Sequence, residues 1–565
     1  MLVATVVLIE VVAMSRPLRH VLTVMAVAMF AAFSFTIAPG AARAADTGAI
    51  TVDGKVATRY DAYRLFSVTV IDDADADQKV ATDITWANDA VRQAVLPVLH
   101  DAGLDGSAST AQEAAEWMNA DGHMTTALAA KLARAIVKAG AVSVPLNAGT
   151  AAEQPNGYWL IVADDDAIGQ DEAGTAPILT LVGGSAVTVK PKAATPKVAK
   201  HVLEDSTAAW GKAADATVGD DLYWRLSATV PAGLTAYDAY AVQFVDTMSA
   251  GLDPSKVAAS MRVYAAAGAD GGFDAVQTGK DGRAGTEPAQ GWTDITGQCK
   301  VTVEGNAFTV RTGDLIAALG GADAFAAGAR VVAVYDAPLT SGCNHGIAKG
   351  NPNEVYLRYP RSPFADQSGD AGFTRTPSDD ATAYTWDLAL TKRGSDGDKP
   401  LLGAVLSITD GRGRTLAADG MWDAEGKATV TTGEDGRVTV SGVDSGKLEV
   451  RELKAPKGYA AFEGTRSVTV KAEGLDVDQV AAAKPKLTIT AESPLRADSA
   501  DGSTGSLEAS LINTPTGTPP SITTGGFMPS TGDMAMYAVA AAAVAGAALL
   551  VVALLIKRGG GSHKS

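Results

Sequence analysis

Apolar and polar residues alternate along much of this chain, which is the pattern of β-strands with one buried and one exposed face. The alternation is clear at residues 60–68, 240–247 and 386–392, and similar runs occur near 49–52, 156–162, 218–226, 350–357, 436–440 and 507–513. Two stretches have helical spacing instead, Asn88 to His100 and Thr110 to Trp117, and Thr110 with Glu113 forms a plausible capping box. The pattern predicts an all-β protein of tandem β-sandwich domains, the first of them with inserted helices.

Breaks in this pattern divide the chain. The 565 residues, at roughly 100 to 200 per domain, allow three or four domains. Proline-punctuated stretches near residues 190–196 and 515–527 look like a linker and a spacer. The expected order is 45–189 first domain, 190–196 linker, 197–359 middle domain, 360–381 linker, 382–514 third domain and 515–527 spacer.

The N-terminus has the features of an export signal. Arg16, Arg19 and His20 precede an apolar stretch, and Ala42-Arg43-Ala44 supplies the small residues of a signal-peptidase site. We expect a signal peptide over residues 1–44. The apolar residues before the basic group have no use in such a signal, so translation is expected to begin at Met14.

The C-terminus carries a second signal. Met528-Pro529-Ser530-Thr531-Gly532 is followed by an apolar run over 534–556, long enough to cross a bilayer, and by a basic tail over 557–565. Pro529 keeps the pentapeptide extended and out of a helix. An ordinary membrane anchor would explain the apolar run, but not the pentapeptide in front of it.

Composition narrows the function. The net charge of -17 argues against nucleic acid as a partner. The acidic runs at 72–77 and 164–166 lack the glycine and terminal glutamate of an EF-hand loop, so solvated loops are favoured over calcium sites. We expect no metal and no cofactor. Cys299 and Cys343 are the only cysteines, and in an exported protein such a pair favours a disulfide over a metal site.

The two ends and the linker together resemble a known family. The pentapeptide resembles the LPxTG signal of sortase substrates in Gram-positive bacteria, with Met528 in place of Leu. Val187-Thr188-Val189-Lys190-Pro191-Lys192 is similar to the pilin motif of sortase-assembled fimbrial shaft subunits, except that Lys190 stands where an aromatic is usual. The resemblance implies immunoglobulin-like domains, cleavage between Thr531 and Gly532, and Lys192 as acceptor. Lys190 and Lys197 are the alternative acceptors.

The middle domain resembles a fimbrial domain in which an intramolecular amide joins a lysine to an asparagine beside an acid. Lys200 and Asp246 match the lysine and the acid. The usual asparagine after the closing strand is missing, because Tyr359-Pro360-Arg361 stands there. The resemblance therefore leaves two outcomes, a missing cross-link or its transfer to Asn351 or Asn353.

The third domain resembles the collagen-binding-B type more closely. Its phrase Lys447 to Tyr459 looks like the E-box of that family, in which a glutamate catalyses an amide between lysine and asparagine. The resemblance assigns Lys392 as the lysine, Glu452 as the catalytic acid and Asn513 as the partner. Burial would help the chemistry, because it lowers the pKa of a lysine and raises that of a glutamate. An ordinary Lys392–Glu452 salt bridge is the alternative.

These features predict a structural subunit of a covalently polymerised fimbria, on the surface of a Gram-positive bacterium and anchored to its wall. It would be no enzyme beyond its own amide formation. The expected partners are other copies of itself, pilin-specific and housekeeping sortases, minor pilins, peptidoglycan and host surface ligands. A monomeric wall-anchored adhesin is the alternative. An anchored hydrolase lacks support, because neither H-E-x-x-H nor G-x-S-x-G occurs.

Overall fold

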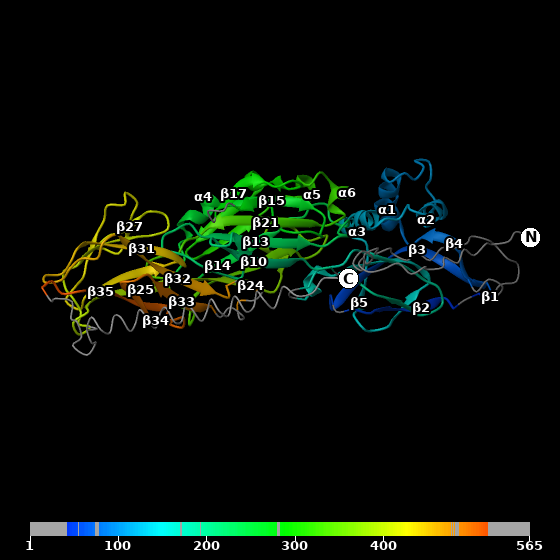
Figure 1. The fold of residues 1–565 in the computed structure, drawn as a ribbon. Coiled ribbons are helices and arrows are strands. Elements are labelled where there is room, and N and C mark those ends of the chain that lie inside the picture. The colour runs from blue at the N-terminus through cyan, green and yellow to red at the C-terminus, as the bar shows by residue number, and fades with distance from the viewer. Residues whose placement is uncertain are drawn as a thin grey trace, which may run out of the picture.

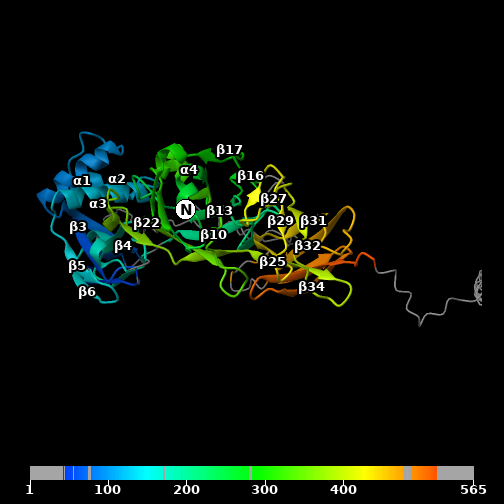
Figure 2. The ribbon, with the colours of Figure 1, turned by 90° about the vertical axis from the view of Figure 1, so that its left-hand side faces the viewer.

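Three units follow one another along an elongated molecule, with the long helices at the N-terminal end (Figures 1 and 2). This computed structural model describes residues 42–43, 45–54, 56–73, 78–169, 172–191, 194–278, 283–475, 477, 480 and 485–517. Most of the expected signal peptide and the whole sorting signal lie outside these residues. No helix within the described ranges is long and apolar enough to cross a membrane.

The first unit combines two sheets with three helices. A six-stranded sheet has the order β1-β3-β7-β8, with β4 and β5 also paired to β3, and a small sheet has the order β6-β2-β9. The strands are β1 (Ala42–Arg43), β2 (Thr47–Val52), β3 (Arg59–Asp73), β4 (Gln78–Trp86), β5 (Val144–Asn147), β6 (Ala152–Pro155), β7 (Gly157–Ala163), β8 (Ile178–Val182) and β9 (Val187–Val189). One core lies between the sheets, and a second lies between the helices and the larger sheet.

The helices are α1 (Asp89–Asp101), α2 (Ala111–Asn119) and α3 (Thr126–Lys138). The first two occupy the stretches with helical spacing, and Thr110 and Glu113 form the expected capping box. Helix α3 was not expected from the sequence. Thr125 caps it by accepting the Leu128 amide, and its inward residues include Leu128, Leu132 and Ile136, spaced by four.

The middle unit is a sandwich of two larger sheets. One has the order β11-β10-β13-β21-β15-β18 and the other β12-β24-β22-β14-β20-β19, with β23 also paired to β22. The strands are β10 (Lys197–Glu204), β11 (Ala209–Gly211), β12 (Ala213–Asp215), β13 (Tyr223–Val230), β14 (Gln243–Met248), β15 (Arg262–Ala267), β18 (Thr293–Asp294), β19 (Lys300–Glu304), β20 (Ala307–Arg311), β21 (Ala329–Asp336), β22 (Asn351–Pro360), β23 (Phe373–Arg375) and β24 (Asp379–Tyr384). A separate ribbon, β16 (Val276–Thr278) with β17 (Ala284–Pro288), and the single-turn helices α4 (Val257–Ser260), α5 (Leu315–Ala318) and α6 (Ala322–Phe325) complete it.

Residues 360–381, expected as a linker, differ from that expectation. They contain β23 and the start of β24, and both strands pair with β22. This stretch lies between the strands that the alternation pattern predicts near 350–357 and 386–392. Its two strands are short, and both pair with the longer strand β22. The alternation of apolar and polar residues within a short window does not reveal such a pairing.

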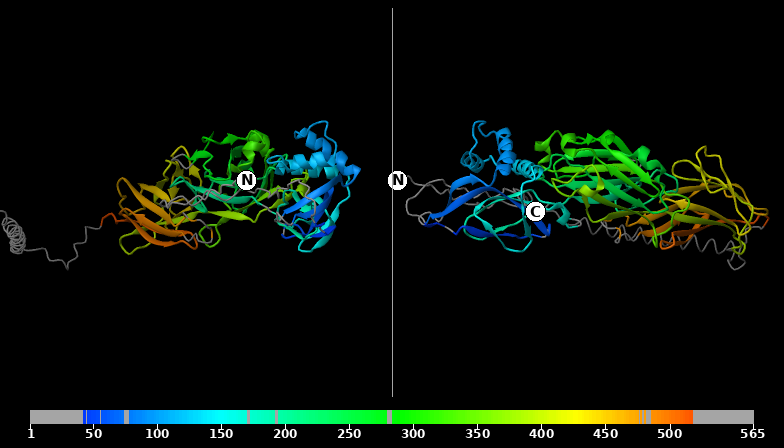
Figure 3. Two further views of the ribbon diagram at one scale, coloured as in Figure 1. Left: turned by 90° about the vertical axis from the view of Figure 1, so that its right-hand side faces the viewer. Right: turned by 180° about the vertical axis from the view of Figure 1, so that it is seen from behind.

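The third unit is a smaller sandwich at the opposite end of the molecule from the helices (Figure 3). Its sheets have the orders β30-β25-β35-β34 and β28-β27-β26-β31-β32-β33, with β29 also paired to β26. The strands are β25 (Trp386–Gly394), β26 (Val405–Thr409), β27 (Thr415–Leu416), β28 (Trp422–Asp423), β29 (Val430–Thr431), β30 (Arg437–Val443), β31 (Gly446–Lys454), β32 (Thr465–Glu473), β33 (Lys486–Ala491), β34 (Leu495–Asp501) and β35 (Ser506–Asn513). The expected all-β class of immunoglobulin-like sandwiches, with helices inserted in the first, is confirmed.

The first and last strands of the third unit lie side by side. β25 and β35 run parallel, and Lys392 is registered with Leu511 while Gly394 is registered with Asn513. Because parallel neighbours need a long crossover, the whole domain is folded between these two strands. The fold therefore places Lys392 and Asn513, which are far apart in the sequence, on neighbouring strands.

Candidate functional site

Three strands of the third unit each carry one polar residue into the core. On β25 the buried positions alternate through Trp386, Leu388 and Leu390 to Lys392. Glu452 follows Leu448 and Val450 in the same way on β31, and Asn513 follows Leu507, Ala509 and Leu511 on β35. Each polar residue thus takes the next inward position after a run of apolar ones, and the pleat directs its side chain into the core.

The three side chains meet around the carboxyl group of Glu452. Asn513 Nδ2 donates to Glu452 Oε1 at 2.9 Å and to Oε2 at 3.0 Å. Lys392 Nζ lies 3.7 Å from Glu452 Oε1 and donates to the Leu511 carbonyl at 3.2 Å. The side chains of Lys392 and Glu452 have no exposed surface. The structure thus brings together the lysine, acid and asparagine that the sequence pointed to.

Burial changes the charge state of Lys392. Desolvation lowers its pKa to about 8, and the attraction of Glu452 offsets only part of that effect. At that value about a tenth of the lysine is neutral at pH 7, and the neutral amine is the form that can attack a carboxamide. This property distinguishes the site from an ordinary surface salt bridge.

One atom of the site lacks a partner. Asn513 Oδ1 is buried and accepts no hydrogen bond, although buried polar atoms in folded proteins are nearly always satisfied. A 180° turn of the carboxamide, together with a proton on Glu452, would supply a donor to Oδ1. That arrangement is the one which polarises the carbonyl for attack.

A second cluster of this kind lies in the core of the middle unit. Lys200 on β10 contacts Asp246 Oδ2 on β14 in a pair with no exposed surface. Lys200 also donates to the Tyr335 hydroxyl at 3.0 Å, Tyr335 donates to Asp246 Oδ2 at 3.1 Å, and Asn353 Nδ2 donates to Tyr335 at 2.8 Å. A lysine, an acid and an asparagine again meet in a dry core.

The lysine of this second cluster is affected by burial in the same way as Lys392. Desolvation lowers the pKa of Lys200 to about 8 and raises the pKa of Asp246, although their mutual attraction opposes both changes. Asp246 Oδ1 and Asn353 Oδ1 are buried without partners. The same deficit of donors at the carboxamide therefore occurs at both sites.

The structure distinguishes between the two candidate asparagines of the middle unit. Asn351 is fully satisfied elsewhere, because its Oδ1 accepts from Asn344 N at 2.9 Å and its Nδ2 donates to the Asn344 and Ala383 carbonyls. Asn353 instead lies next to Met248 in the β14–β22 register, two residues from Asp246. Tyr335, which links Asn353 to Lys200, was not expected, and no motif marked it within its valine-rich strand.

The acceptor candidates lie around the linker. Lys192 is outside the described residues. Lys190 is exposed and pairs with Asp53 at 3.6 Å, and Lys197 begins β10 with an exposed side chain. Thr531, Gly532 and the rest of the pentapeptide also lie outside the described residues. The acceptor lysine and the cleavage site therefore stay predictions.

The expected disulfide between Cys299 and Cys343 is wrong, because both cysteines are free thiols. Cys299 precedes β19 at the end where Arg311 is registered with Gln243, the first residue of β14. Cys343 lies against Gly251, beyond the last residue of β14. The two thiols thus lie near opposite ends of a strand about 16 Å long at 3.3 Å per residue, whereas a disulfide needs Cα atoms within about 7 Å.

The described residues contain no group of three or more His, Cys, Asp or Glu side chains placed to hold a metal ion. The second acidic run forms a turn at Asp165–Ala167, and Asp164 pairs with Arg59. Residues 74–77 of the first run are not described.

Comparison with known proteins identifies a known domain type in the third unit. Residues 387–484 match the family model described as SpaA, a prealbumin-like fold domain. The trypsin-resistant surface T6 protein of Streptococcus pyogenes serotype M6 is 30% identical over 129 residues, which are 21% of this chain and 22% of that protein. The match thus spans about a fifth of the length of that relative.

Solved structures of similar arrangement include the T6 backbone pilin of serotype M6 Streptococcus pyogenes, at 16% identity and a TM-score of 0.45, covering 84% of this chain and 99% of that one. Another is the full-length major pilin SpaD of Corynebacterium diphtheriae, at 14% identity and a TM-score of 0.40, covering 83% and 97%. The chain is similar to backbone pilins of Gram-positive bacteria.

Proposed function

We propose that this chain is the shaft subunit of a covalently polymerised cell-surface pilus, in which the C-terminal threonine of one subunit is joined to a linker lysine of the next. The observation that carries the proposal is the pair of buried lysine–acid–asparagine clusters, each in its own sandwich. A globular enzyme has no evident use for two such clusters whose lysine and acid side chains have no exposed surface. A subunit that must stay intact in a filament outside the cell would use them to form internal cross-links.

The chemistry at the third unit begins with neutral Lys392. Its Nζ attacks the Asn513 carboxamide carbon, while protonated Glu452 donates to Oδ1 and stabilises the developing oxyanion. The new C–N bond forms, the bond to Nδ2 breaks, and Glu452 passes the proton of the lysine to the departing nitrogen, which leaves as ammonia. Glu452 ends as it began, and no cofactor is consumed.

The same reaction fits the middle unit with Lys200 as nucleophile and Asn353 as the carboxamide. Asp246, whose pKa is raised by burial, takes the part of Glu452. Tyr335 holds both reactants, since its hydroxyl contacts Lys200 at 3.0 Å and Asn353 at 2.8 Å. A folded core that keeps such groups in contact replaces a chance encounter by a fixed geometry.

Polymerisation uses the ends of the chain. A thiol transpeptidase would cleave between Thr531 and Gly532 and hold the threonine carbonyl as a thioester, and the amine of Lys192 on a second subunit would displace the thiol. A donor and an acceptor at different places on one protein make a contact that does not close, so a filament results. Attachment of the last subunit to peptidoglycan would anchor that filament to the wall.

The test is a denaturing gel of wall extracts from cells carrying the natural chain or Lys192→Ala. We expect a ladder of covalent multimers from the natural chain and only monomer from the variant. Lys190→Ala is the matched control, because Lys190 is an exposed lysine of the same linker. We expect this variant to keep the ladder, since its acceptor Lys192 is unchanged. A ladder that persists in Lys192→Ala and vanishes in Lys190→Ala would move the acceptor by two residues.

Thr531→Ala tests the donor separately. We expect the variant to stay in the membrane fraction without multimers, since the acyl group for transfer is lost. If the natural chain itself gave no ladder but was wall-bound, the monomeric adhesin would replace the shaft subunit as the function.

A further inference from the structure

The middle and third units dock through a cluster of carboxyl groups that takes no part in the amide chemistry. Their contact is visible in Figure 2, where the strands of the third unit follow directly on those of the middle one. Glu204, Asp205 and Asp215 come from the middle unit, and Asp444 comes from the turn between β30 and β31 of the third. Like charges brought so close would oppose docking if all four were ionised.

Asp215 is the centre of this cluster. It is 2% exposed, and its Oδ2 accepts three hydrogen bonds from the third unit. The donors are Trp386 Nε1 at 2.5 Å, Ser445 N at 3.0 Å and the Ser445 hydroxyl. Its other oxygen, Oδ1, is buried and accepts no hydrogen bond from an N–H group or hydroxyl of the described residues. A carboxylate so placed lacks one donor.

Asp444 can supply that donor only as a carboxylic acid. Its side chain lies within hydrogen-bonding reach of Asp215 and of Asp205. Burial with the charges of Asp215, Asp205 and Glu204 raises the pKa of Asp444 well above the usual value. Glu204 on β10 behaves similarly, because burial and Asp215 raise its pKa to about 8.

Most cationic groups at this interface pair with carboxyl groups outside the cluster, and Arg412 also reaches one of its members, Asp205. His345 of the middle unit contacts Asp387 of the third at 2.8 Å. Arg412 contacts Asp220 at 2.6 Å and Asp205 at 3.3 Å, and Arg414 contacts Asp220 at 2.5 and 2.8 Å and Asp410 at 2.7 Å. On the outer side, Asp221 pairs with Lys256 and Arg283. No arginine or lysine ion pair to Asp215 or Asp444 occurs among the described residues.

We infer that Asp444 holds a proton which it donates to Asp215 Oδ1, so that this carboxyl–carboxylate bond makes the docking of the third unit on the middle unit dependent on pH. Loss of the proton puts two adjacent negative charges in a nearly dry interface. Because the docked state binds more protons than the separated one, docking weakens as pH rises from about 4, the pKa of a free aspartate, through the raised value. Acidification therefore tightens the junction between the two units.

The test is hydrogen exchange of the full mature chain, followed by mass spectrometry of peptides that cover the interface. Two amides report docking directly, since Val218 N donates to Gly442 O at 2.9 Å and Ser445 N donates to Asp215. After correction for the intrinsic pH dependence of exchange, we expect these peptides to be more protected at pH 5.5 than at pH 8.5, by about tenfold for each pH unit of that interval that lies below the raised pKa of Asp444. Peptides from β35 in the core serve as the internal reference and should show no such change.

Asp444→Asn is the decisive variant, because its amide can still donate to Asp215 but cannot titrate. We expect it to be as protected at pH 8.5 as the natural chain is at pH 5.5. Asp444→Ala should remove the pH dependence and dock more weakly at pH 5.5. A natural chain with equal protection at both pH values would overturn the inference. So would a pH dependence that survives in Asp444→Asn and disappears in Glu204→Gln.

Discussion

Burial decides which lysines of this chain can act as nucleophiles. Lys200 and Lys392 have no exposed surface, and desolvation lowers the pKa of each to about 8. Lys190, by contrast, has a side chain that is 73% exposed. The proposed intramolecular amides would thus need only the fold, whereas a linker lysine would need an enzyme that has already activated its partner.

The third unit should lose one ammonia. We expect the mature natural chain to be lighter than its sequence mass by about 17 Da for each amide formed with expulsion of ammonia. A peptide that joins the β25 and β35 sequences should appear after proteolysis. Glu452→Ala should keep the full sequence mass of this unit and remove the joined peptide. Glu452→Gln keeps the shape of the side chain but no acid, and the joined peptide at normal yield in that variant would exclude the acid role.

The middle unit should lose a second ammonia. Asn353→Ala is expected to abolish the joined peptide of β10 and β22, because Asn353 shares Tyr335 with Lys200. Asn351→Ala is the matched control from the same strand and should keep that peptide, since Asn351 is bonded to Asn344 and Ala383 instead. The opposite result for the two variants would assign the reaction to Asn351.

An unlinked Lys392 should make stability depend on pH. In Asn513→Ala the lysine and Glu452 remain, but no amide can form. Because the folded pKa of about 8 lies below the unfolded value of about 10.4, the folded state binds fewer protons, and stability rises with pH between these two values. We expect a gain of about 2 to 3 kcal/mol from pH 7 to pH 10.5 in that variant.

Thermal melts at both pH values measure this gain. The natural chain is the control, because its amide carries no charge and should show no such rise from Lys392. A variant whose melting temperature does not move relative to that of the natural chain would contradict the lowered pKa.

At the scale of elements, the phase of each strand predicts much of the site. Lys392, Glu452 and Asn513 each continue an apolar alternation, so the sequence alone places all three in the core of a sandwich. Asn353 precedes Val355 and Leu357 in the same phase. The signal that could have indicated Asn353 is a polar residue in phase with the buried face of its strand. The motif of the resembled family instead places the asparagine after that strand.

Other elements could not be predicted in this way. The position of Tyr335 depends on how two sheets pack, and the separation of Cys299 from Cys343 depends on the β14–β20–β19 register. Neither is a local property of the chain. The pairing of β24 with β22 is likewise a long-range contact that composition does not encode.

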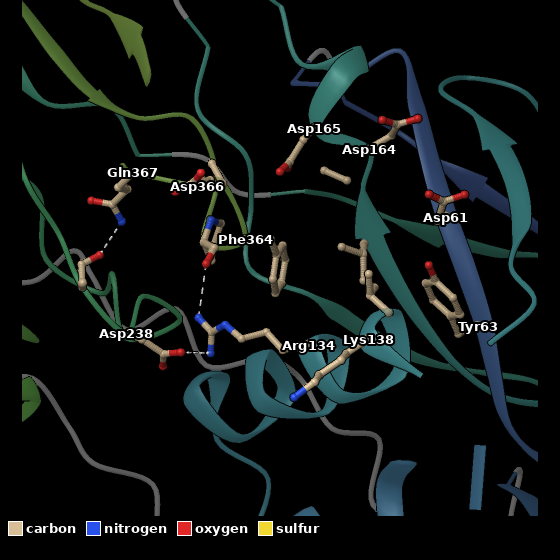
Figure 4. Close-up of a pocket in the computed structure, with 16 residues that line it drawn as sticks. Asp61, Tyr63, Arg134, Lys138, Asp164, Asp165, Asp238, Phe364, Asp366 and Gln367 are labelled. Atoms are coloured by element: carbon tan, nitrogen blue, oxygen red, sulfur yellow. Dashed lines mark hydrogen bonds and ion pairs between the residues drawn. The ribbon is translucent and has the colours of Figure 1, made fainter. Parts of the chain in front are cut away.

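Helix α3 fixes the first unit to the middle one. Figure 4 shows Arg134 of this helix beside Asp238 and Phe364, and all three residues line a cavity of about 670 Å³. Its guanidinium donates to the Ala236 carbonyl at 2.6 Å and to the Pro363 carbonyl at 3.2 Å, contacts Asp238 at 2.9 Å and lies over the Phe364 ring. These contacts join a helix of one unit to two loops of the next.

Arg134→Ala should loosen this junction. We expect the linker at residues 190–196 to be cleaved severalfold faster by a protease, while the melting of the third unit is unchanged. Arg92→Ala is the matched control, because Arg92 is an exposed helical arginine of α1 whose ion pair with Asp89 stays within its own helix. Equal cleavage of both variants would show that Arg134 does not hold the units together.

At the scale of the whole molecule, the three units lie in a row, and the two clusters lie along that row (Figures 1 and 3). Each cluster joins a strand near the start of its unit to one near the end, β10 to β22 and β25 to β35. In a filament linked from Lys192 to Thr531, the amides divide the subunit into closed loops and a connecting path. The loops comprise residues 201–352 and 393–512.

The parallel register of β25 and β35 then has a mechanical consequence. If both proposed amides form, the load on a pulled filament would pass from Lys200 through one amide to Asn353, along residues 354–391, and through the other amide from Lys392 to Asn513. Neither closed loop would then carry it. Only the connecting path can lengthen, and β24 is its weakest part, held by β22 and by the short β12. Stretched between its ends, the subunit should give a step of roughly 100 Å as residues 354–384 straighten at about 3.5 Å each, and Asn353→Ala should replace that step by the far longer extension of a whole sandwich.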